Sequence, residues 1–248
     1  MSEQKTYSWV SAGATDVGHV RQINEDAYLE RSDIGLWVVA DGMGGHHAGD
    51  VASSNIIDVL DDTNPSNRLS DYVDEVEDRI ISVNDQLVKM AKQHDDNRTI
   101  GSTVVAMIAL DGHSAILWAG DSRAYRCRNN ECVQLTRDHS QVEEMVQRGL
   151  ILPEEAEEHP ASNVITRAVG AADNIYVDVE IDEIQPNDTF LLCSDGLNKH
   201  VSDAEIGQFL QHQNLEEIPQ RLVETTLQRG AIDNITVIVI RAFANSSN

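Results

Sequence analysis

Apolar runs of strand length recur along most of the chain, and turn-forming residues separate them. Nine such runs predict β-strands, over residues 8–14, 36–40, 102–110, 114–119, 124–127, 132–135, 177–181, 189–193 and 235–240. Asp111-Gly112 and Asn129-Asn130 lie between neighbouring runs and have the composition of two-residue hairpin turns. Because such turns join antiparallel strands, we expect mostly antiparallel sheets.

A second pattern, with apolar positions at alternating steps of three and four, predicts a helix over residues 69–92. Its apolar stripe comprises Val73, Val76, Ile80, Val83, Leu87 and Met90. The residues before it predict a helix over 48–60, whose inward positions are Val51, Ala52, Ile56, Val59 and Leu60. Ser202-Asp203-Ala204-Glu205 is a capping box that opens a short helix, and a further helix is expected over 215–228.

Strands and helices do not alternate along the chain, which disfavours a parallel sheet of the Rossmann type. The pattern predicts an α+β fold in which two sheets pack face to face with helices outside. The segment 141–161 differs from the rest, because it is polar and contains Pro153, Pro160 and the acidic cluster 154–158. We interpret it as a small, mobile, helical insertion between strands.

Charge narrows the classes of partner. The chain of 248 residues has 42 acidic and 18 basic residues and a formal net charge of −24. This balance argues against nucleic acid or an anionic membrane as partner, because no basic surface is available to neutralise phosphates. The sequence shows no secretory h-region and no run of the roughly 20 apolar residues that a membrane span requires. We therefore expect a cytoplasmic protein.

The chain has three cysteines, and this low, odd count fits a reducing compartment. Cys127 and Cys132 face each other if Asn129-Asn130 forms the turn of a hairpin. The favoured interpretation is two unlinked strand residues. The alternative is a reversible redox link between them.

Four aspartates mark the ends of apolar runs. Asp41, Asp121 and Asp195 each follow a run, and Asp233 precedes the last one. Buried strands fix the positions of their ends, so these carboxylates can converge at one edge of the core. Converging carboxylates repel each other unless cations lie between them, and ligands that offer only oxygen suit Mg²⁺ or Mn²⁺. The sequence therefore predicts a metal-dependent enzyme.

Two further segments carry polar groups with possible roles at such a site. The glycine-rich loop 42–49 lacks the Lys-Ser/Thr ending of a P-loop and the third glycine of a dinucleotide fingerprint. It leaves Gly42, whose backbone can approach a metal closely enough for its carbonyl to be a ligand. Arg21 has a planar guanidinium that matches phosphate oxygens, while Glu25 and Asp26 can hold metal-bound water.

In their order, these segments resemble the metal-dependent serine/threonine phosphatases of the PPM (PP2C-type) family in its compact bacterial form. The matching segments are 21–26, 41–45, 101–103, 120–123, 194–197 and 233–236, which together span nearly the whole chain. The resemblance implies a single catalytic domain over 1–248, built as a β-sandwich flanked by helix pairs. It also implies that 141–161 is the flap beside the active site.

The resemblance implies Mn²⁺ or Mg²⁺ as cofactor, with two core ions and a third, weaker one. Asp41 would bridge the two core ions. Asp195 and Asp233 would complete the first core site, and the Gly42 carbonyl would contribute to the second. Asp121 would form the third site together with Asp195.

The remaining roles concern substrate and protons. Arg21 would bind the substrate phosphate, and Glu25 and Asp26 would support the metals through water. A metal-activated water would then attack phosphorus in line. Met43 stands where animal relatives have a histidine that has been assigned as general acid, and His46 is equally well interpreted as an ordinary loop residue. The general acid therefore stays unassigned.

The resemblance implies phosphorylated proteins as partners, including a serine/threonine kinase or its targets, and we expect a monomer. Two other functions share the same residues. One is a binding module that senses a partner without turnover, although such a protein could lose ligands and none is lost here. The other is a hydrolase of small phosphate esters.

Overall fold

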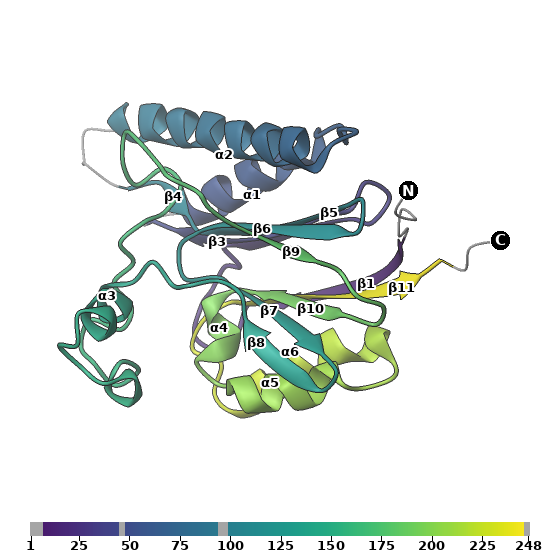
Figure 1. The fold of residues 1–248 in the computed structure, drawn as a ribbon. Coiled ribbons are helices and arrows are strands. Elements are labelled where there is room, and N and C mark those ends of the chain that lie inside the picture. Colours follow the sequence, from purple (N-terminus) through teal and green to yellow (C-terminus); the bar gives the residue numbers. More distant parts are fainter. Residues whose placement is uncertain (1–6, 45–47, 94–98, 246–248) are drawn as a thin grey trace.

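The computed structural model describes residues 7–44, 48–93 and 99–245. In these residues two sheets pack face to face, and helices cover the outer side of each (Figure 1). The strand pairs within both sheets are antiparallel. The α+β sandwich expected from the sequence is therefore confirmed.

The first sheet brings both ends of the described chain together. Its strand order is β1 (Tyr7–Asp16), β11 (Ile235–Ala244), β10 (Thr189–Cys193), β7 (Arg123–Arg128) and β8 (Glu131–Gln134). Three helices lie on its outer side: α4 (Asp195–Asn198), α5 (Asp203–Leu210) and α6 (Ile218–Gln228), the last preceded by the short η2 (Leu215–Glu217).

The second sheet has the order β2 (Asp26–Arg31), β3 (Leu36–Met43), β5 (Val104–Leu110), β6 (His113–Ala119) and β9 (Asp178–Glu183). The short β4 (Gly101–Ser102) pairs with the end of β3. Helices α1 (Ala48–Asp61) and α2 (Leu69–Lys92) cover this sheet. Both were predicted almost to the residue, but Val51 is 42% exposed and not inward as expected, because Gly49 and Ser53 occupy the face that packs on β2 and β3.

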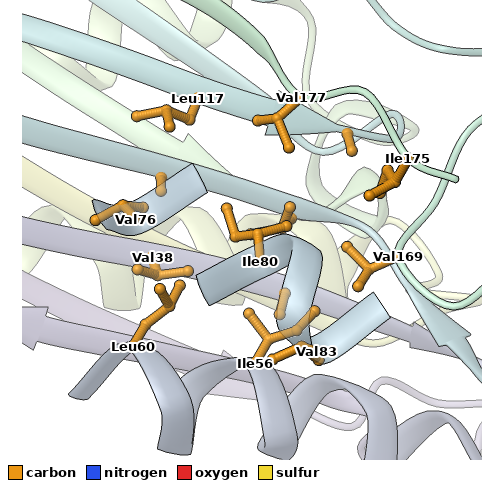
Figure 2. Packing of buried hydrophobic residues seen from close by; sticks show 14 of the residues in the cluster. Val38, Ile56, Leu60, Val76, Ile80, Val83, Leu117, Val169, Ile175 and Val177 are labelled. Carbon is orange, nitrogen blue, oxygen red and sulfur yellow. The ribbon is translucent and has the colours of Figure 1, made fainter. Parts of the chain in front are cut away.

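Apolar side chains fill the space between neighbouring layers of the sandwich. The predicted stripe of α2 packs with α1 and the second sheet, as Val76, Ile80 and Val83 show beside Ile56 and Val38 (Figure 2). Between the two sheets lies a separate cluster that includes Trp37, Met107 and Phe190, all fully or nearly fully buried. This double packing fixes the strand ends, where the predicted site residues lie.

The structure contains one strand that the hydrophobic pattern did not indicate. Strand β2 has the sequence Asp-Ala-Tyr-Leu-Glu-Arg, and each of its residues is half-buried at the sheet edge. An edge strand of this composition lacks the apolar alternation of a buried strand. Its register with β3 runs from Asp26 opposite Asp41 to Arg31 opposite Leu36, so β2 brings a fifth aspartate to the predicted site.

The predicted insertion leaves the sheets at the same end as the site (Figure 1). Its base is a bridge between Ser140 and Ile165, and it contains α3 (Gln141–Gln147) and the short η1 (Pro153–Glu155). The Ser140 hydroxyl caps α3 by accepting a hydrogen bond from the Glu143 amide at 3.2 Å. Its helical character is confirmed, and its mobility stays a prediction.

The β7–β8 hairpin confirms the predicted turn. Asn129 and Asn130 have φ of 51° and 67°, the left-handed conformations that a type I′ turn requires. Cys127 lies directly opposite Cys132, with their Cα atoms 4.0 Å apart, and the two form a disulfide. The interpretation of two unlinked cysteines is therefore wrong, and a redox role for the link stays a prediction.

Among the described helices, none is long and apolar enough to cross a membrane.

The predicted capping box at the start of α5 is confirmed. Ser202 accepts a hydrogen bond from the Glu205 amide, and the Glu205 carboxylate accepts one from the Ser202 amide at 3.0 Å. We expect Ser202→Ala to lower the free energy of unfolding by about 1 kcal/mol, and to lower Tm by about 3 °C. Ser82→Ala on the exposed face of α2 is the control, and thermal melts with equal losses for both variants would contradict the capping role.

Candidate functional site

The strand ends deliver the predicted residues to one side of the sandwich. Asp41 lies near the end of β3, Asp195 opens α4 two residues after the end of β10, and Asp233 lies two residues before β11. These three line a cavity of about 530 Å³ together with Arg21, Glu25 and Gly42. A second cavity of about 650 Å³ contains Asp121 and shares Asn163, Asp195, Lys199 and Ile232 with the first. The predicted convergence of the acids is therefore observed.

The backbone around Asp41 is held from two sides. Its amide donates to the Thr103 hydroxyl at 3.2 Å, and its carbonyl accepts from the Thr103 amide at 2.8 Å and the Ser102 hydroxyl at 2.9 Å. Gly42 packs so tightly that an added Cβ would collide with the carbonyl oxygens of Gly49 and Glu25. Only glycine fits this position, so the chain can pass between the site and the start of α1.

Glu25 is fixed by a residue that sequence reasoning missed. The Asn234 side-chain oxygen accepts a hydrogen bond from the Glu25 amide at 2.8 Å, and its nitrogen donates to the carbonyls of Val17 and Ile23 at 2.9 and 3.0 Å. The Glu25 carboxylate in turn accepts from the Gly49 amide at 3.2 Å, at the start of α1. Asn234 therefore holds the loop that carries the predicted phosphate and water ligands.

Asp26 lies beneath the site, where a second unpredicted residue supports it. The Ser194 hydroxyl donates to Asp26 Oδ2 at 2.8 Å and accepts from the Thr236 amide at 2.9 Å. The other carboxylate oxygen of Asp26, Oδ1, is buried and has no hydrogen-bond partner among the described residues. Ser194 directly precedes Asp195 in the sequence, which is the one signal that could have indicated its place.

Two cations of the protein contact the acids. Arg21 holds Asp233 with a two-pronged ion pair, Nε to Oδ1 at 2.8 Å and Nη2 to Oδ2 at 2.9 Å. Lys199 Nζ lies 2.5 Å from Asp195 Oδ2 and 3.8 Å from Asp233 Oδ2. Arg21 was predicted to be at the site, whereas Lys199 was not.

Burial and mutual repulsion dominate the electrostatics of the acids. Burial, followed by the charges of Asp26, Asp195, Asp121 and Asp233, raises the pKa of Asp41 well above its usual value. Burial is also the main cause that raises the pKa of Asp26 and of Asp121 to about 7. Such a group of buried carboxylates is costly to ionise unless a cation binds to it.

The donor chemistry fits divalent ions. The site offers only oxygen ligands of the kind that Mg²⁺ and Mn²⁺ prefer, and buried oxygens of Asp26 and Asp121 lack partners within the described part of the chain. In that same part, no three acidic, histidine or cysteine side chains are grouped closely enough to hold one ion. Arg21 and Lys199 bind the carboxylates of Asp233 and Asp195 instead.

The two residues considered in connection with the general acid are Met43 and His46. Met43 lies at the wall of the first cavity, where a thioether cannot donate a proton. His46 lies outside the described residues.

The raised pKa values predict how pH affects the metal-free protein. A carboxyl whose pKa is higher in the folded state favours folding at low pH, and this contribution is lost as pH rises from about 4 towards the folded-state pKa near 7. In EDTA, we expect Tm to fall between pH 5 and 8, on the order of 5 °C more than in an Asp41→Asn variant. Mn²⁺ should reverse the trend, since ions bind ionised carboxylates. Thermal melts with equal slopes for both proteins would contradict this origin.

Comparison with known proteins identifies the family to which the chain belongs. A family model described as "Protein phosphatase 2C" matches residues 10–145. A serine/threonine phosphatase stp of Listeria welshimeri is 37% identical over 234 residues, covering 91% of this chain and 93% of the relative. The serine/threonine protein phosphatase PstP of Mycobacterium tuberculosis is 35% identical over 231 residues, which cover 92% of this chain and 44% of PstP.

Solved structures agree in fold over almost the whole chain. PppA of Pseudomonas aeruginosa, described as a key regulatory component of T6SS, has a TM-score of 0.90 and 40% identity over 96% of this chain and 100% of PppA. The catalytic domain of PstP in complex with two manganese ions has a TM-score of 0.85 and 33% identity over 96% of this chain and 100% of that domain.

Proposed function

Because this chain belongs to the protein phosphatase 2C family and is a metal-dependent serine/threonine protein phosphatase, we propose that the acidic cavity is its active site. The observation that carries this proposal is the convergence of five aspartates from both sheets around Asp41, whose pKa the other four raise. Arg21 lies half-exposed at the same cavity, where a phosphate group can reach its guanidinium.

We propose that Asp41 binds both core metal ions, that Asp195 and Asp233 complete one core site, and that the Gly42 carbonyl contributes to the other. Asp121, with Asp195, would hold a third ion. Bound Mn²⁺ or Mg²⁺ supplies the Lewis acidity that makes a water molecule nucleophilic at neutral pH. Glu25 and Asp26 would act through water, which is supported by the Gly49 and Ser194 hydrogen bonds that orient them.

Arg21 is proposed to bind the phosphate of the substrate. Its guanidinium already makes a two-pronged ion pair with Asp233, and phosphate oxygens match the same pair of donors. If Asp233 served as a metal ligand, these two donors would become available to the phosphate. Arg21 would therefore link the substrate to one of the metal ligands.

We propose that the peptide around the phosphoresidue extends into the second cavity. This cavity joins the first and is bounded by the flap on one side and by α4 and the start of α5 on the other. Its charged lining is mainly acidic, with Asp138, Glu157, Glu158 and Asp203 beside Asp121 and Asp195. Arg123, one of its cations, is paired with Asp138 at 2.7 Å. Such a lining favours substrates with lysine or arginine near the phosphoresidue.

We further propose that the chain forms a single domain, acts as a monomer in the cytoplasm and opposes a serine/threonine kinase of the same cell. The cluster between the two sheets draws residues from both and supports the single domain. The similarity to PppA, described as a regulatory component of T6SS, supports a secretion apparatus as one setting for such a kinase.

The test is phosphate release from phosphothreonine peptides and from a small aryl phosphate, in EDTA, Mg²⁺ or Mn²⁺. We expect no release in EDTA and release with either ion. At low salt, a peptide with flanking arginines should exceed one with flanking glutamates about tenfold in kcat/KM, and salt should reduce the difference. Equal rates for both peptides would contradict the acidic groove, and efficient turnover of the small ester alone would favour a small-ester hydrolase.

A further inference from the structure

A lysine ammonium lies where the two cavities meet. Lys199 directly follows α4, one helical turn after Asp195, and lines both cavities. Its Nζ is 2.5 Å from Asp195 Oδ2 and 3.8 Å from Asp233 Oδ2. Because Asp195 opens α4 and Lys199 caps its end, the short helix sets the distance between the backbones of the two residues. The contact is therefore local and does not depend on a flexible loop.

We propose that Lys199 is a tethered cation that competes with a third divalent ion for Asp195 and Asp121. The inference rests on the proposed active site, because it takes Asp195 and Asp121 as the ligands of that ion. A third ion would have to displace the ammonium from Asp195 Oδ2. Lys199 would thus keep the third site empty until the metal concentration is high.

Asp121, the second proposed ligand of the third ion, is buried and incompletely hydrogen-bonded. It is 7% exposed, and its Oδ1 has no hydrogen-bond partner among the described residues. Asp121 and Lys199 both line the second cavity, together with Asp195. Arg123 does not serve this purpose, because its guanidinium holds Asp138 through Nε and Nη2 at 2.7 to 3.1 Å. Among the described residues, Lys199 is therefore the cation that contacts Asp195 and also shares the cavity of Asp121.

The charge balance of the site points the same way. The proposed metal and water ligands are Glu25, Asp26, Asp41, Asp121, Asp195 and Asp233, and the cations that contact them are Arg21 and Lys199. When all are ionised, the site has four negative charges, which two divalent ions neutralise. A third ion would add positive charge to a ligand set that two ions already neutralise, whereas removing Lys199 restores a negative charge among these ligands that attracts the ion. Coulomb attraction at these short distances makes this difference large enough to measure.

The experiment is a calorimetric titration of the whole protein with Mn²⁺, comparing the parent with Lys199→Met and Lys199→Gln. We expect the parent to bind two ions tightly and a third weakly, and both variants to bind the third at least tenfold more tightly. Lys92→Met is the matched control, because Lys92 also contacts an aspartate at 2.5 Å, namely Asp173, but both partners are exposed on the surface. Adding Asp121→Asn to Lys199→Met should abolish the gain.

The outcomes separate the inference from the function on which it rests. An unchanged third affinity in both variants, or a gain that persists in the double variant with Asp121→Asn, would overturn the role of Lys199 and leave the two-ion site intact. A parent that binds no Mn²⁺ tightly would overturn the proposed site itself, and the inference with it. A melting curve for each variant confirms that it is folded before titration.

Discussion

Asp41→Asn is expected to reduce kcat/KM for a phosphothreonine peptide by about a thousandfold or more, in saturating Mn²⁺. Asp41 lies at the electrostatic centre of the site, since the four other aspartates each raise its pKa. Asparagine keeps the size of the side chain but loses the charge that is proposed to hold two ions. The expected loss corresponds to roughly 4 kcal/mol of transition-state stabilisation, the scale of one essential electrostatic contact.

The same substitution is expected to stabilise the metal-free protein. Removing one of several buried, mutually repelling carboxylates relieves repulsion that is strongest at neutral pH. A higher Tm in EDTA at pH 8 together with lost activity would show that the loss is not caused by unfolding. Asp58→Asn is the control, because Asp58 is exposed on α1 and undergoes the same change of charge. An Asp41→Asn enzyme that keeps more than a tenth of the parent activity would contradict the bridging role.

The fold and the positions of the cavity aspartates could be predicted because they depend on local patterns. The apolar runs that form β3, β6, β10 and β11 are visible in the sequence, and each strand fixes the position of the aspartate near its end. The α2 stripe is a periodic pattern within one helix, and the Ser202 capping box joins residues three positions apart. Such features need no knowledge of which strands pair.

The parts that were missed depend on contacts between distant segments. Asn234 bonds to Glu25 across 209 positions, and Ser194 bonds to Asp26 across 168. No spacing rule predicts these pairs, because they arise only when β2 and β11 meet at one end of the sandwich. Strand β2 was missed for a related reason. Its charged residues are typical of a loop, and they are compatible with a strand only because β2 lies at the edge of the sheet.

Lys199 was missed although its partner is only four positions away. In sequence, an aspartate and a lysine at this spacing are typical of a surface ion pair on a helix. Burial changes the meaning of this pair, because Lys199 Nζ lies among carboxylates and not in bulk water. The spacing is compatible with the contact, but only the tertiary structure shows what surrounds it.

Arg21→Ala is expected to reduce kcat/KM for the same peptide about a hundredfold. Its guanidinium has two proposed tasks, to bind the substrate phosphate and to hold Asp233. Loss of a two-pronged, charge-assisted contact costs roughly 2 to 3 kcal/mol, which matches a hundredfold change. Arg21→Lys should recover only part of the loss, because a lysine is a point charge that cannot contact two oxygens in the same way.

The inhibition constant for inorganic phosphate separates the two tasks of Arg21. If Arg21 binds phosphate, the inhibition constant should rise together with KM in Arg21→Ala. If Arg21 only positions Asp233, the substitution should weaken Mn²⁺ binding and leave the inhibition constant unchanged at saturating metal. Arg31→Ala is the matched control, because Arg31 holds Asp33 with the same two-pronged geometry, at 2.9 and 2.8 Å, away from either cavity. An unchanged constant for phosphate in Arg21→Ala would restrict Arg21 to holding Asp233 and leave the metal ions as the phosphate ligands.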